Sequence, residues 1–404
     1  MNLPHFARAL GSRNYRLYFG GQCVSLLGSW MTSTAAAWLV YRISNKPFDV
    51  GLIYFFSQVP VFILAPLIGV WMDRVDVLKV VRVTQALSLI QSSALAVFTF
   101  TGHMTVASLC WLSTAQGLIN ALDFPARQTL TPQLAGERDL LDNVIALNSI
   151  TFNLARLVGP AIAGFVIYEL GPGACFTVDA ASYLAVLFAL FAVRLQPRPA
   201  RAVVPHPWDD LRDGVRYTWN HPEISRALSL VFIVALLGFA HSVLAPVFAQ
   251  DVYFGDSRTL GFLMAATAVG SLAGGIYLGA LRSTQRIAAL IGFAAIIDGV
   301  GLLLLGGTHG IAWGFVSFAI TGAGSVIVLV GANTLLQTHV DDEKRGRVLS
   351  FYSMVQSVFP FGSVIIGAVA GGWGPRWAVA ACGAACVIGG LGYGRAQAKA
   401  ALSA

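Results

Sequence analysis

The stretch GVWMDRVDVLKVVR, which begins at Gly69 and ends at Arg82, gives the strongest indication of the architecture. It joins two long apolar segments, about 51–72 and 80–100, so its charges mark the point where two membrane-spanning helices turn around in water. Asp73 lies at the end of the first helix, and basic residues follow at the start of the next. Gly69 precedes Asp73 by one helical turn on the same face, where a missing side chain lets a neighbouring helix approach closely. The pattern predicts a latch between helices.

The composition places the chain in a membrane. Of its 404 residues, 56% are hydrophobic and 11% are charged, and the mean hydropathy is +0.70. A soluble domain carries about 25% charged residues, so this chain is predicted to be a multi-pass membrane protein. The net charge of +7 does not indicate nucleic-acid binding, because the basic residues fall in short loops between apolar runs. The five cysteines lie inside apolar runs, so we expect neither disulfides nor a metal site.

Twelve apolar runs are long enough to cross a bilayer, which predicts an all-α membrane protein with twelve transmembrane helices. Of the 26 Lys and Arg residues, 21 lie at the N-terminus, in the turns from even to odd runs, or at the C-terminus. By the positive-inside rule both termini are expected in the cytoplasm. The runs cover about 17–41, 51–72, 80–100, 105–124, 144–168, 174–193, 227–248, 260–281, 287–306, 311–336, 348–371 and 377–393.

The two halves of the chain are similar to each other. The segment 130–138, between the fourth and fifth runs, resembles 336–344, between the tenth and eleventh. A repeat of about 205 residues in a twelve-span protein predicts two pseudo-symmetric six-helix halves around a central pathway. The expected domains are an N-terminal half at 1–193, a cytoplasmic linker at 194–226 and a C-terminal half at 227–404.

The linker contains a predicted amphipathic helix, ended by His221 and Pro222. Apolar residues recur at helical spacing between charged ones, which is typical of a helix that lies on the inner membrane surface. Two interpretations remain open: the helix tethers the two halves, or it rests on lipid without a regulatory role. Its apolar residues are Trp208, Leu211, Val215 and Trp219.

Three predicted helices carry polar residues at steps of three and four, which places each polar stripe on one helical face. A polar stripe at membrane depth must face protein or water, so the three stripes together predict a hydrated substrate pathway. The alternative is a sealed bundle in which these side chains bond between helices. The expected pathway residues are Gln22 and Ser29 in the first run, Gln116 and Asn120 in the fourth, and Asn153 and Arg156 in the fifth.

Arg156 is the basic residue that falls inside a predicted span. A central arginine costs roughly 2.5 to 3.5 kcal/mol in lipid, so its charge must be compensated. A substrate or a moving carboxylate is one interpretation, and a fixed pair with a residue such as Asp123 is the other.

The stretch that begins at Gly69 resembles the loop motif of the major facilitator superfamily of secondary transporters, in which a glycine is followed four residues later by an acid and then by a basic residue. The match is partial, since Asp76 stands where the second glycine of the motif is usual. The resemblance implies a cytoplasmic latch whose ion pairs separate when the inner mouth opens. The alternative is that these charges only set topology. The latch residues would be Gly69, Asp73, Arg74, Asp123 and Arg127.

A second resemblance concerns the direction of transport. The run from Gly159 and Pro160 to Gly164 is similar to the Gly-Pro motif of drug and metabolite exporters in the superfamily, with Ala163 where a glycine is typical. The proline bends the helix, and the small residues let it pack closely against another. Together with 14–19 and 125–128, this helix resembles the branch that includes macrolide efflux proteins and the enterobactin exporter. The resemblance implies export.

Ionisable groups inside the predicted helices are candidates to carry a proton across the membrane. Structural hydrogen bonding is the alternative interpretation for the two acids in the sixth and ninth runs. The candidates are Asp123, Asp179, His241 and Asp298.

The sequence also lacks several motifs. It contains no phosphate-binding Gly-x-x-x-x-Gly-Lys-Ser/Thr loop, no Gly-x-Ser-x-Gly and no His-Glu-x-x-His, so direct ATP drive is not expected, and a membrane enzyme or sensor is the weaker alternative. We predict a secondary transporter that exports an amphiphilic organic solute, such as a drug or siderophore, by alternating access and proton antiport. It would act as a monomer in the bacterial cytoplasmic (inner) membrane, with no cofactor, metal or nucleic acid. A lysophospholipid or uptake carrier on the same fold is the alternative.

Overall fold

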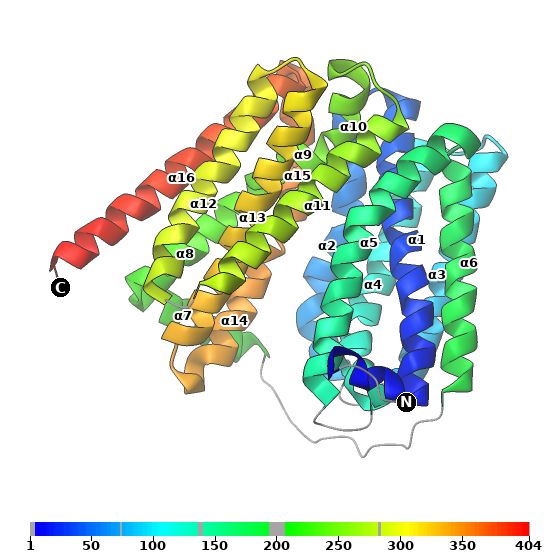
Figure 1. The fold of residues 1–404 in the computed structure, drawn as a ribbon, viewed down its shortest axis with the longest axis horizontal. Coiled ribbons are helices and arrows are strands. Elements are labelled where there is room, and N and C mark those ends of the chain that lie inside the picture. The colour runs from blue at the N-terminus through cyan, green and yellow to red at the C-terminus, as the bar shows by residue number, and fades with distance from the viewer. Residues whose placement is uncertain (1–4, 73–74, 136–139, 194–206, 282–283, 404) are drawn as a thin grey trace. The chain divides into compact units, whose positions relative to one another are not determined.

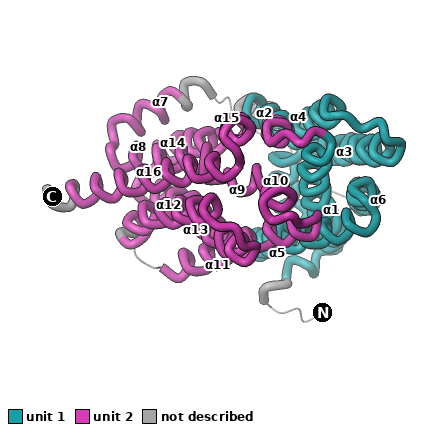
Figure 2. The backbone as a smooth tube through the Cα atoms, turned by 90° about the horizontal axis from the view of Figure 1, so that it is seen from above, with its two compact units in different colours: residues 1–43, 56–205 teal, residues 44–55, 206–404 magenta. Residues whose placement is uncertain are grey.

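The protein is helical throughout the part that the computed structural model describes, which covers residues 5–72, 75–135, 140–193, 207–281 and 284–403. The chain packs into two compact units, shown in two colours in Figure 2. Unit 1 holds residues 1–43 and 56–205, and unit 2 holds residues 44–55 and 206–404. The predicted all-α class is confirmed. The predicted domain bounds stay a prediction. Residues 44–55, which the prediction placed in the N-terminal half, group with unit 2.

Six long helices begin in the first half of the chain and can be followed from blue to green in Figure 1, after a short 3-10 helix, η1 (His5–Gly11). Within unit 1, α3 packs along α6 and against α4. The bounds are α1 (Arg13–Ser44), α2 (Pro47–Met72), α3 (Val77–Phe100), α4 (Val106–Ala135), α5 (Leu141–Leu170) and α6 (Pro172–Ala192).

Unit 2 holds the remaining helices, and two of its six spans are broken. The seventh span runs through α8 (Pro222–Ile233), the π-helical η3 (Val234–Gly238), α9 (Ala240–Val243), α10 (Ala245–Val247) and the π-helical η4 (Phe248–Val252). The eleventh span consists of α14 (Asp342–Gln356) and α15 (Phe359–Trp373). The other spans are α11 (Ser257–Ala280), α12 (Thr284–Gly307), α13 (Ile311–His339) and α16 (Pro375–Ser403).

Eleven helical segments in the described ranges are long and apolar enough to cross a membrane. The helix that falls short is α4, and it is the one that carries Gln116, Asn120, Asp123 and Arg127 on one face. With α4 included, the twelve predicted transmembrane helices are confirmed. Its low hydropathy comes from its polar stripe, and polar side chains at membrane depth must face protein or water.

Small residues set how closely the helices of unit 2 pack. A Cβ atom on Gly299 of α12 would lie 2.5 Å from the carbonyl oxygen of Gly383 on α16, and a Cβ on Gly383 would lie 2.6 Å from that of Gly299. Because no side chain fits between these backbones, dispersion contacts along the two helices are close and numerous. The glycine content therefore has a structural cause in helix packing.

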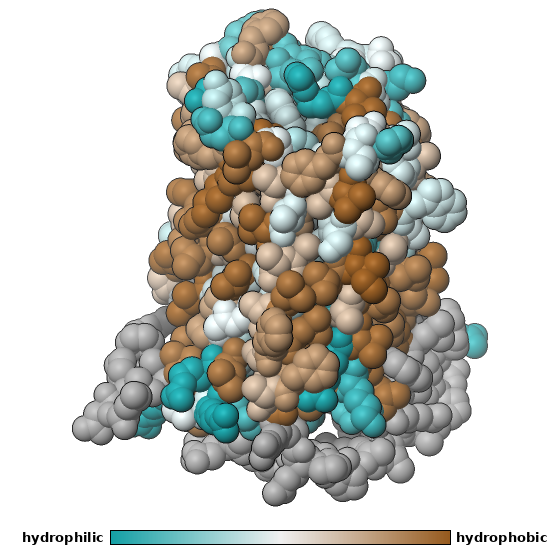
Figure 3. Space-filling view, turned by 90° about the vertical axis from the view of Figure 1, so that its right-hand side faces the viewer, coloured by the Kyte–Doolittle hydropathy of each residue, from teal (hydrophilic) through white to brown (hydrophobic). Residues whose placement is uncertain are grey.

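Apolar side chains cover the surface where lipid is expected. On the face shown in Figure 3, apolar residues cover the middle and polar residues gather towards the two ends. Ile90 on α3 and Phe188 on α6 leave 65% and 74% of their surface exposed. Such exposed side chains suit a hydrocarbon solvent, which confirms the multi-pass membrane character predicted from composition.

The predicted amphipathic linker helix is α7 (Pro207–Asn220), and it packs against α14 within unit 2. Asp213 pairs with Arg347 at 2.5 Å, and a Cβ on Gly214 would lie 2.6 Å from the Arg347 carbonyl oxygen. Thr218 is buried, whereas Trp219 is 81% exposed. The sequence pattern had grouped Trp219 with the apolar face, but α7 packs through its small residues and leaves that ring outside, where it suits a membrane interface.

Asp256 caps the N-terminus of α11 and supports a pH-dependent prediction. Its carboxylate accepts hydrogen bonds from the backbone N–H groups of Arg258 and Thr259 and pairs with the Arg258 guanidinium at 2.6 Å. The Arg258 hydrogen bonds hold the pKa of Asp256 below its usual value. A group with a lowered pKa stabilises the folded state at neutral pH, and this stabilisation is lost as the pH falls through the folded-state pKa.

We expect Asp256→Ala to lower the free energy of unfolding by about 1 kcal/mol at neutral pH, because the helix loses its cap. Asp256→Asn keeps a capping side chain and should cost less. The wild type should lose stability relative to Asp256→Asn as the pH falls, which unfolding in detergent at a series of pH values would measure. An identical pH dependence in the two proteins would contradict this assignment.

Candidate functional site

The polar stripe on α4 remains accessible at mid-helix. Asn120 is exposed and Gln116 is half-buried, and Gln116 Nε2 donates to Asn120 Oδ1 at 3.0 Å and to Ser88 Oγ of α3 at 3.4 Å. On α5, Asn153 is exposed and its Nδ2 donates to the Ser149 carbonyl at 2.8 Å. An exposed amide in the middle of a membrane-length helix is compatible with water but costly in lipid. These positions suit a hydrated face of unit 1.

The other predicted pathway residues lie in different surroundings. Arg156 on α5 is half-buried, and Gln22 on α1 is buried. Ser29 lies inside the contact between α1 and α6, where its Oγ donates to the Ser25 carbonyl at 2.9 Å and lies 3.3 Å from the Tyr183 hydroxyl. The structure therefore groups Ser29 with α6, and not with the amides of α4. The assignment of all six residues to one pathway stays a prediction.

Asp123 and Arg127 on α4 form a buried pair. The Asp123 Oδ2 to Arg127 Nε distance is 2.5 Å, and Asp123 is 6% exposed. Asp123 Oδ1 also accepts from Thr84 Oγ1 at 2.6 Å and from Gln85 Nε2 at 3.0 Å, both on α3. This carboxylate is thus held by a cation on its own helix and by two donors on the neighbouring one. The pair is charge-assisted, which makes each hydrogen bond stronger than a neutral one.

The remaining latch residues can be placed only in part. Gly69 lies in the last turn of α2. Asp73 and Arg74, which the latch requires, lie outside the described residues. The proposed pairing of these two with Asp123 and Arg127 therefore stays a prediction.

The Gly-Pro motif lies where α5 approaches α1. A Cβ on Gly159 would lie 2.6 Å from the Trp30 Cβ, so the glycine allows the close approach. Pro160 is buried and has no N–H, so it cannot bond to the carbonyl of Arg156 one turn earlier. Gly164 follows one turn later on the same helix. The motif thus places a backbone irregularity directly at Arg156.

The candidate proton carriers other than Asp123 are fully or almost fully buried. Asp179 on α6 accepts from Ser92 Oγ at 2.9 Å, and Asp298 on α12 accepts from Ser325 Oγ at 2.8 Å. His241 on α9 donates from its Nδ1–H to the Gly238 carbonyl oxygen at 3.1 Å. Within the described residues, no group of three or more acidic, histidine or cysteine side chains is arranged to hold a metal.

Sequence reasoning missed polar positions in the second half. Asn333 and Gln337 on α13 are hydrogen-bonded to each other, and Gln337 is exposed. Ser353 and Gln356 on α14 are exposed as well. The signal was present, because Asn333 and Gln337 repeat the four-residue spacing of the α4 amides. Unit 2 therefore has its own polar stripes on the tenth and eleventh spans.

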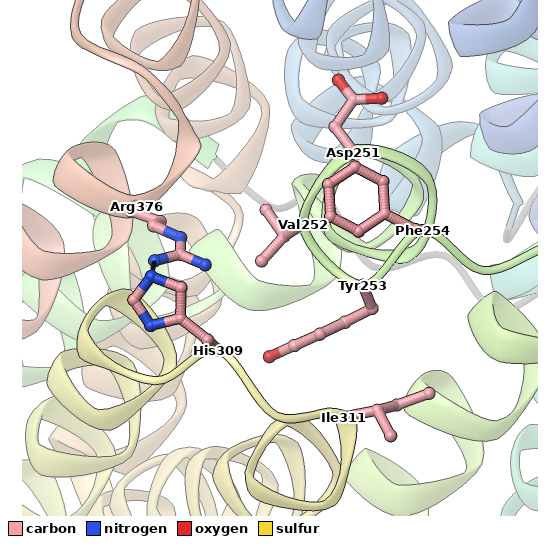
Figure 4. Close-up of a pocket in the computed structure, with 7 residues that line it drawn as sticks. All are labelled: Asp251, Val252, Tyr253, Phe254, His309, Ile311 and Arg376. Carbon is pink, nitrogen blue, oxygen red and sulfur yellow. Dashed lines mark hydrogen bonds between the residues drawn. The ribbon is translucent and has the colours of Figure 1, made fainter.

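A pocket of about 400 Å³ with a largely apolar surface lies in unit 2, lined by residues from η4 and the loop after it, from the loop before α13 and the start of α13, and from the start of α16. Figure 4 shows Tyr253 pointing towards His309 and Arg376, whereas the carboxylate of Asp251 points away. Arg376 hydrogen-bonds to His309. No sequence motif had indicated this pocket, since its residues come from three separate turns.

Comparison with known families settles the identity of the fold. A family model described as "Transmembrane secretion effector" matches residues 8–401. The chain belongs to this family of the major facilitator superfamily. The predicted superfamily and branch are therefore confirmed, and the protein is a multi-pass membrane protein with the fold of a secondary transporter.

Relatives within the superfamily span most of the chain. The staphyloferrin A transporter of Staphylococcus aureus is 24% identical over 87% of this chain and 88% of its own length. The multidrug efflux pump Tap of Mycolicibacterium fortuitum is 26% identical over 85% of this chain and 86% of its own. The enterobactin exporter EntS of Citrobacter koseri is 24% identical over 89% and 85%, respectively.

Solved structures share the superfamily fold at low sequence identity. The nucleoside transporter NupG (D323A mutant) superposes with a TM-score of 0.75, at 11% identity, over 93% of this chain and 98% of that one. A bacterial homologue of the lysosomal transporter Spinster, in an inward-facing and occupied conformation, gives 0.73 at 13% identity over 95% and 96%. These likenesses concern the fold alone.

Proposed function

We propose that this protein exports an amphiphilic organic solute from the bacterial cytoplasm by alternating access and proton antiport. The observation that carries the proposal is the exposed Asn120 and Asn153 on membrane-length helices of a superfamily transporter. The names of the relatives, which include siderophore transporters and a multidrug pump, support the substrate class. The Lys and Arg distribution supports a cytoplasmic location for both termini.

The side chains of α4 and α5 suit a solute with both polar and apolar parts. The amides of Gln116, Asn120 and Asn153 can donate and accept hydrogen bonds, while the half-buried Arg156 can pair with an anionic group. The apolar residues around them would accept the rest of the solute. At the cytoplasmic end, Asp123 and Arg127, joined by Asp73 and Arg74, would form contacts that break when the inner mouth opens. Transport of this kind changes no covalent bond and needs no cofactor.

Inverted membrane vesicles test the proposal, because their cytoplasmic face is outside. Vesicles that contain the protein would be supplied with erythromycin, enterobactin, ethidium or a lysophosphatidylglycerol. We expect uptake of at least one of the first three after the lumen is acidified, and loss of uptake when nigericin collapses the pH gradient. Uptake of the lysolipid alone would favour the lipid carrier. Uptake that does not depend on the pH gradient would overturn proton antiport.

Arg156→Ala separates a pathway role from a packing role. If Arg156 faces the solute, the variant should weaken binding of the transported compound by about tenfold or more, as expected for a lost charge-assisted contact. Its thermal stability should change little. Ligand-induced thermal stabilisation would measure both, with Arg212→Ala on the exposed surface of α7 as the control. A loss of stability with unchanged binding would instead assign Arg156 to helix packing.

A further inference from the structure

Two carboxyl groups, one in each unit, are almost completely buried in contacts between helices. Asp179 in unit 1 is 1% exposed, and Asp298 in unit 2 is 0% exposed. Neither has a Lys, Arg or His nitrogen within salt-bridge distance among the described residues. This distinguishes both from Asp123, which has its own cation on the same helix.

Three helices meet at Asp179. The residue lies on α6, its Oδ2 accepts from Ser92 Oγ of α3 at 2.9 Å, and its Oδ1 lies 3.4 Å from Ser29 Oγ of α1. A Cβ on Gly28 would lie 2.8 Å from Asp179 Oδ1. The backbone of α1 therefore touches the carboxyl group directly.

The surroundings of Asp298 have the same plan. The residue lies on α12, and the Cys386 thiol of α16 faces its carboxyl group. A Cβ on Gly238, in the π-helical part of the seventh span, would lie 2.6 Å from Asp298 Oδ2. Ser325 Oγ on α13 donates to Oδ1 at 2.8 Å. As in unit 1, a glycine on the first helix of the half, here Gly238, lets the backbone approach the buried carboxyl group, here that of Asp298.

The two sites match in the sequence repeat. Ser92 and Asp298 are 206 residues apart, and Asp179 and Cys386 are 207 apart, close to the repeat of the two halves. The third and sixth helices of each half pack against each other, as α3 with α6 and α12 with α16. The acid and its partner have exchanged helices between the halves. Both halves therefore have a buried carboxyl group at this helix contact, on the sixth helix of the first half and on the third helix of the second half.

The charged groups near each site are few. The Arg127 guanidinium of α4 acts on Asp179 electrostatically but is paired with Asp123. Tyr183 and Cys175 lie on the same helix as Asp179, while Cys382 faces Asp298 from α16. His241 is hydrogen-bonded to the carbonyl oxygen of Gly238, the glycine that lies against Asp298. A carboxylate among hydroxyl and thiol donors costs far more to bury charged than neutral.

We propose that Asp179 and Asp298 are a repeated pair of proton-binding sites, one in each half, placed where the first, third and sixth helices of that half meet. The proposal rests on the proposed proton antiport and names the groups that carry the protons. Each site exchanges one proton between its carboxyl group and water. Because Gly28 and Gly238 touch these carboxyl groups, a change of charge acts directly on α1 and on the seventh span, the helices whose movement would link proton transfer to access.

Infrared spectroscopy of the protein in lipid nanodiscs tests the sites without a substrate. Exposed Asp and Glu side chains are ionised at about pH 6, so a carbonyl band of protonated carboxyl groups that persists there and vanishes near pH 9 reports buried acids. We expect Asp179→Asn and Asp298→Asn each to lose part of this band, and the double variant to lose it all. The control Asp142→Asn, at an exposed position of α5, should leave the band intact.

Two further variants keep both acids in case an asparagine variant does not fold. Ser92→Ala and Ser325→Ala each remove one hydroxyl donor, and each should move part of the carbonyl band to higher frequency. An unchanged band in all of these variants would overturn the proposal. Vesicle transport separates this proposal from the proposed function. Transport that does not depend on the pH gradient would contradict proton antiport, but the pH-dependent carbonyl band would remain. Transport by the double variant that is still driven by the pH gradient would contradict the assignment of the two sites.

Discussion

Gly270→Ala is expected to lower the free energy of unfolding by at least about 3 kcal/mol, or to prevent folding, because the added methyl group would meet backbone and not a movable side chain. A Cβ at Gly270 of α11 would lie 1.8 Å from the carbonyl oxygen of Ala319 on α13. These two helices pack along each other within unit 2, so the clash can be relieved only by moving one of them. Unfolding of the purified protein in mixed micelles, followed by circular dichroism, would measure the loss.

Gly275→Ala on the same helix is the matched control. The nearest atom to a Cβ at this position is Val326 Cγ1 at 3.9 Å, an ordinary contact. Both variants gain the same helix propensity, so their difference isolates the contact with α13. We expect the control to be as stable as the wild type, or more stable by up to about 1 kcal/mol. Equal destabilisation of the two variants would show that the close approach of α11 and α13 is not what Gly270 provides.

Asp123→Ala should destabilise the protein by about 3 to 5 kcal/mol, because it leaves a buried guanidinium without its carboxylate. The variant also removes the acceptor of Thr84 and Gln85, two donors on α3. The same mixed-micelle unfolding would measure the loss.

A double-mutant cycle identifies the source of this loss. Asp123→Ala combined with Arg127→Met removes both charges, so the double variant should recover a large part of the stability that the single variant loses. A double variant whose losses simply add would show that the two residues act independently in the folded protein. Recovery of stability without recovery of transport would favour a role for the pair in the cytoplasmic latch.

Local sequence properties were sufficient to predict the helices and their order. The apolar runs match the observed spans because a helix that crosses a bilayer satisfies its own backbone hydrogen bonds and needs only an apolar length of chain. The end of α7 before His221 and Pro222 was predicted for a local reason as well, since proline cannot continue a helix. The polar stripe of α4 was also visible, and it explains why that helix is less apolar than the other spans.

Side-chain partners were harder to predict. Ser29 belongs to a periodic stripe that was expected to face water, yet it lies against Asp179 and Tyr183. Trp219 was grouped with an apolar face, yet α7 packs through Gly214 and Thr218. Periodicity identifies the residues that share a face of one helix, but it cannot tell whether that face meets water, lipid or another helix.

The membrane-spanning class, the number of helices and the two-fold repeat could be predicted without any coordinates, because hydropathy, length and charge act locally along the chain. The tertiary structure was needed to show that Asp123 pairs with a cation, whereas the hydroxyl groups that donate to Asp179 and Asp298 within the described residues are neutral. Ser92 is 87 residues from Asp179, and no pattern within one helix connects them. Such contacts depend on how closely helices pack, which glycines at particular crossings set, and packing is a property of helix pairs rather than of single runs.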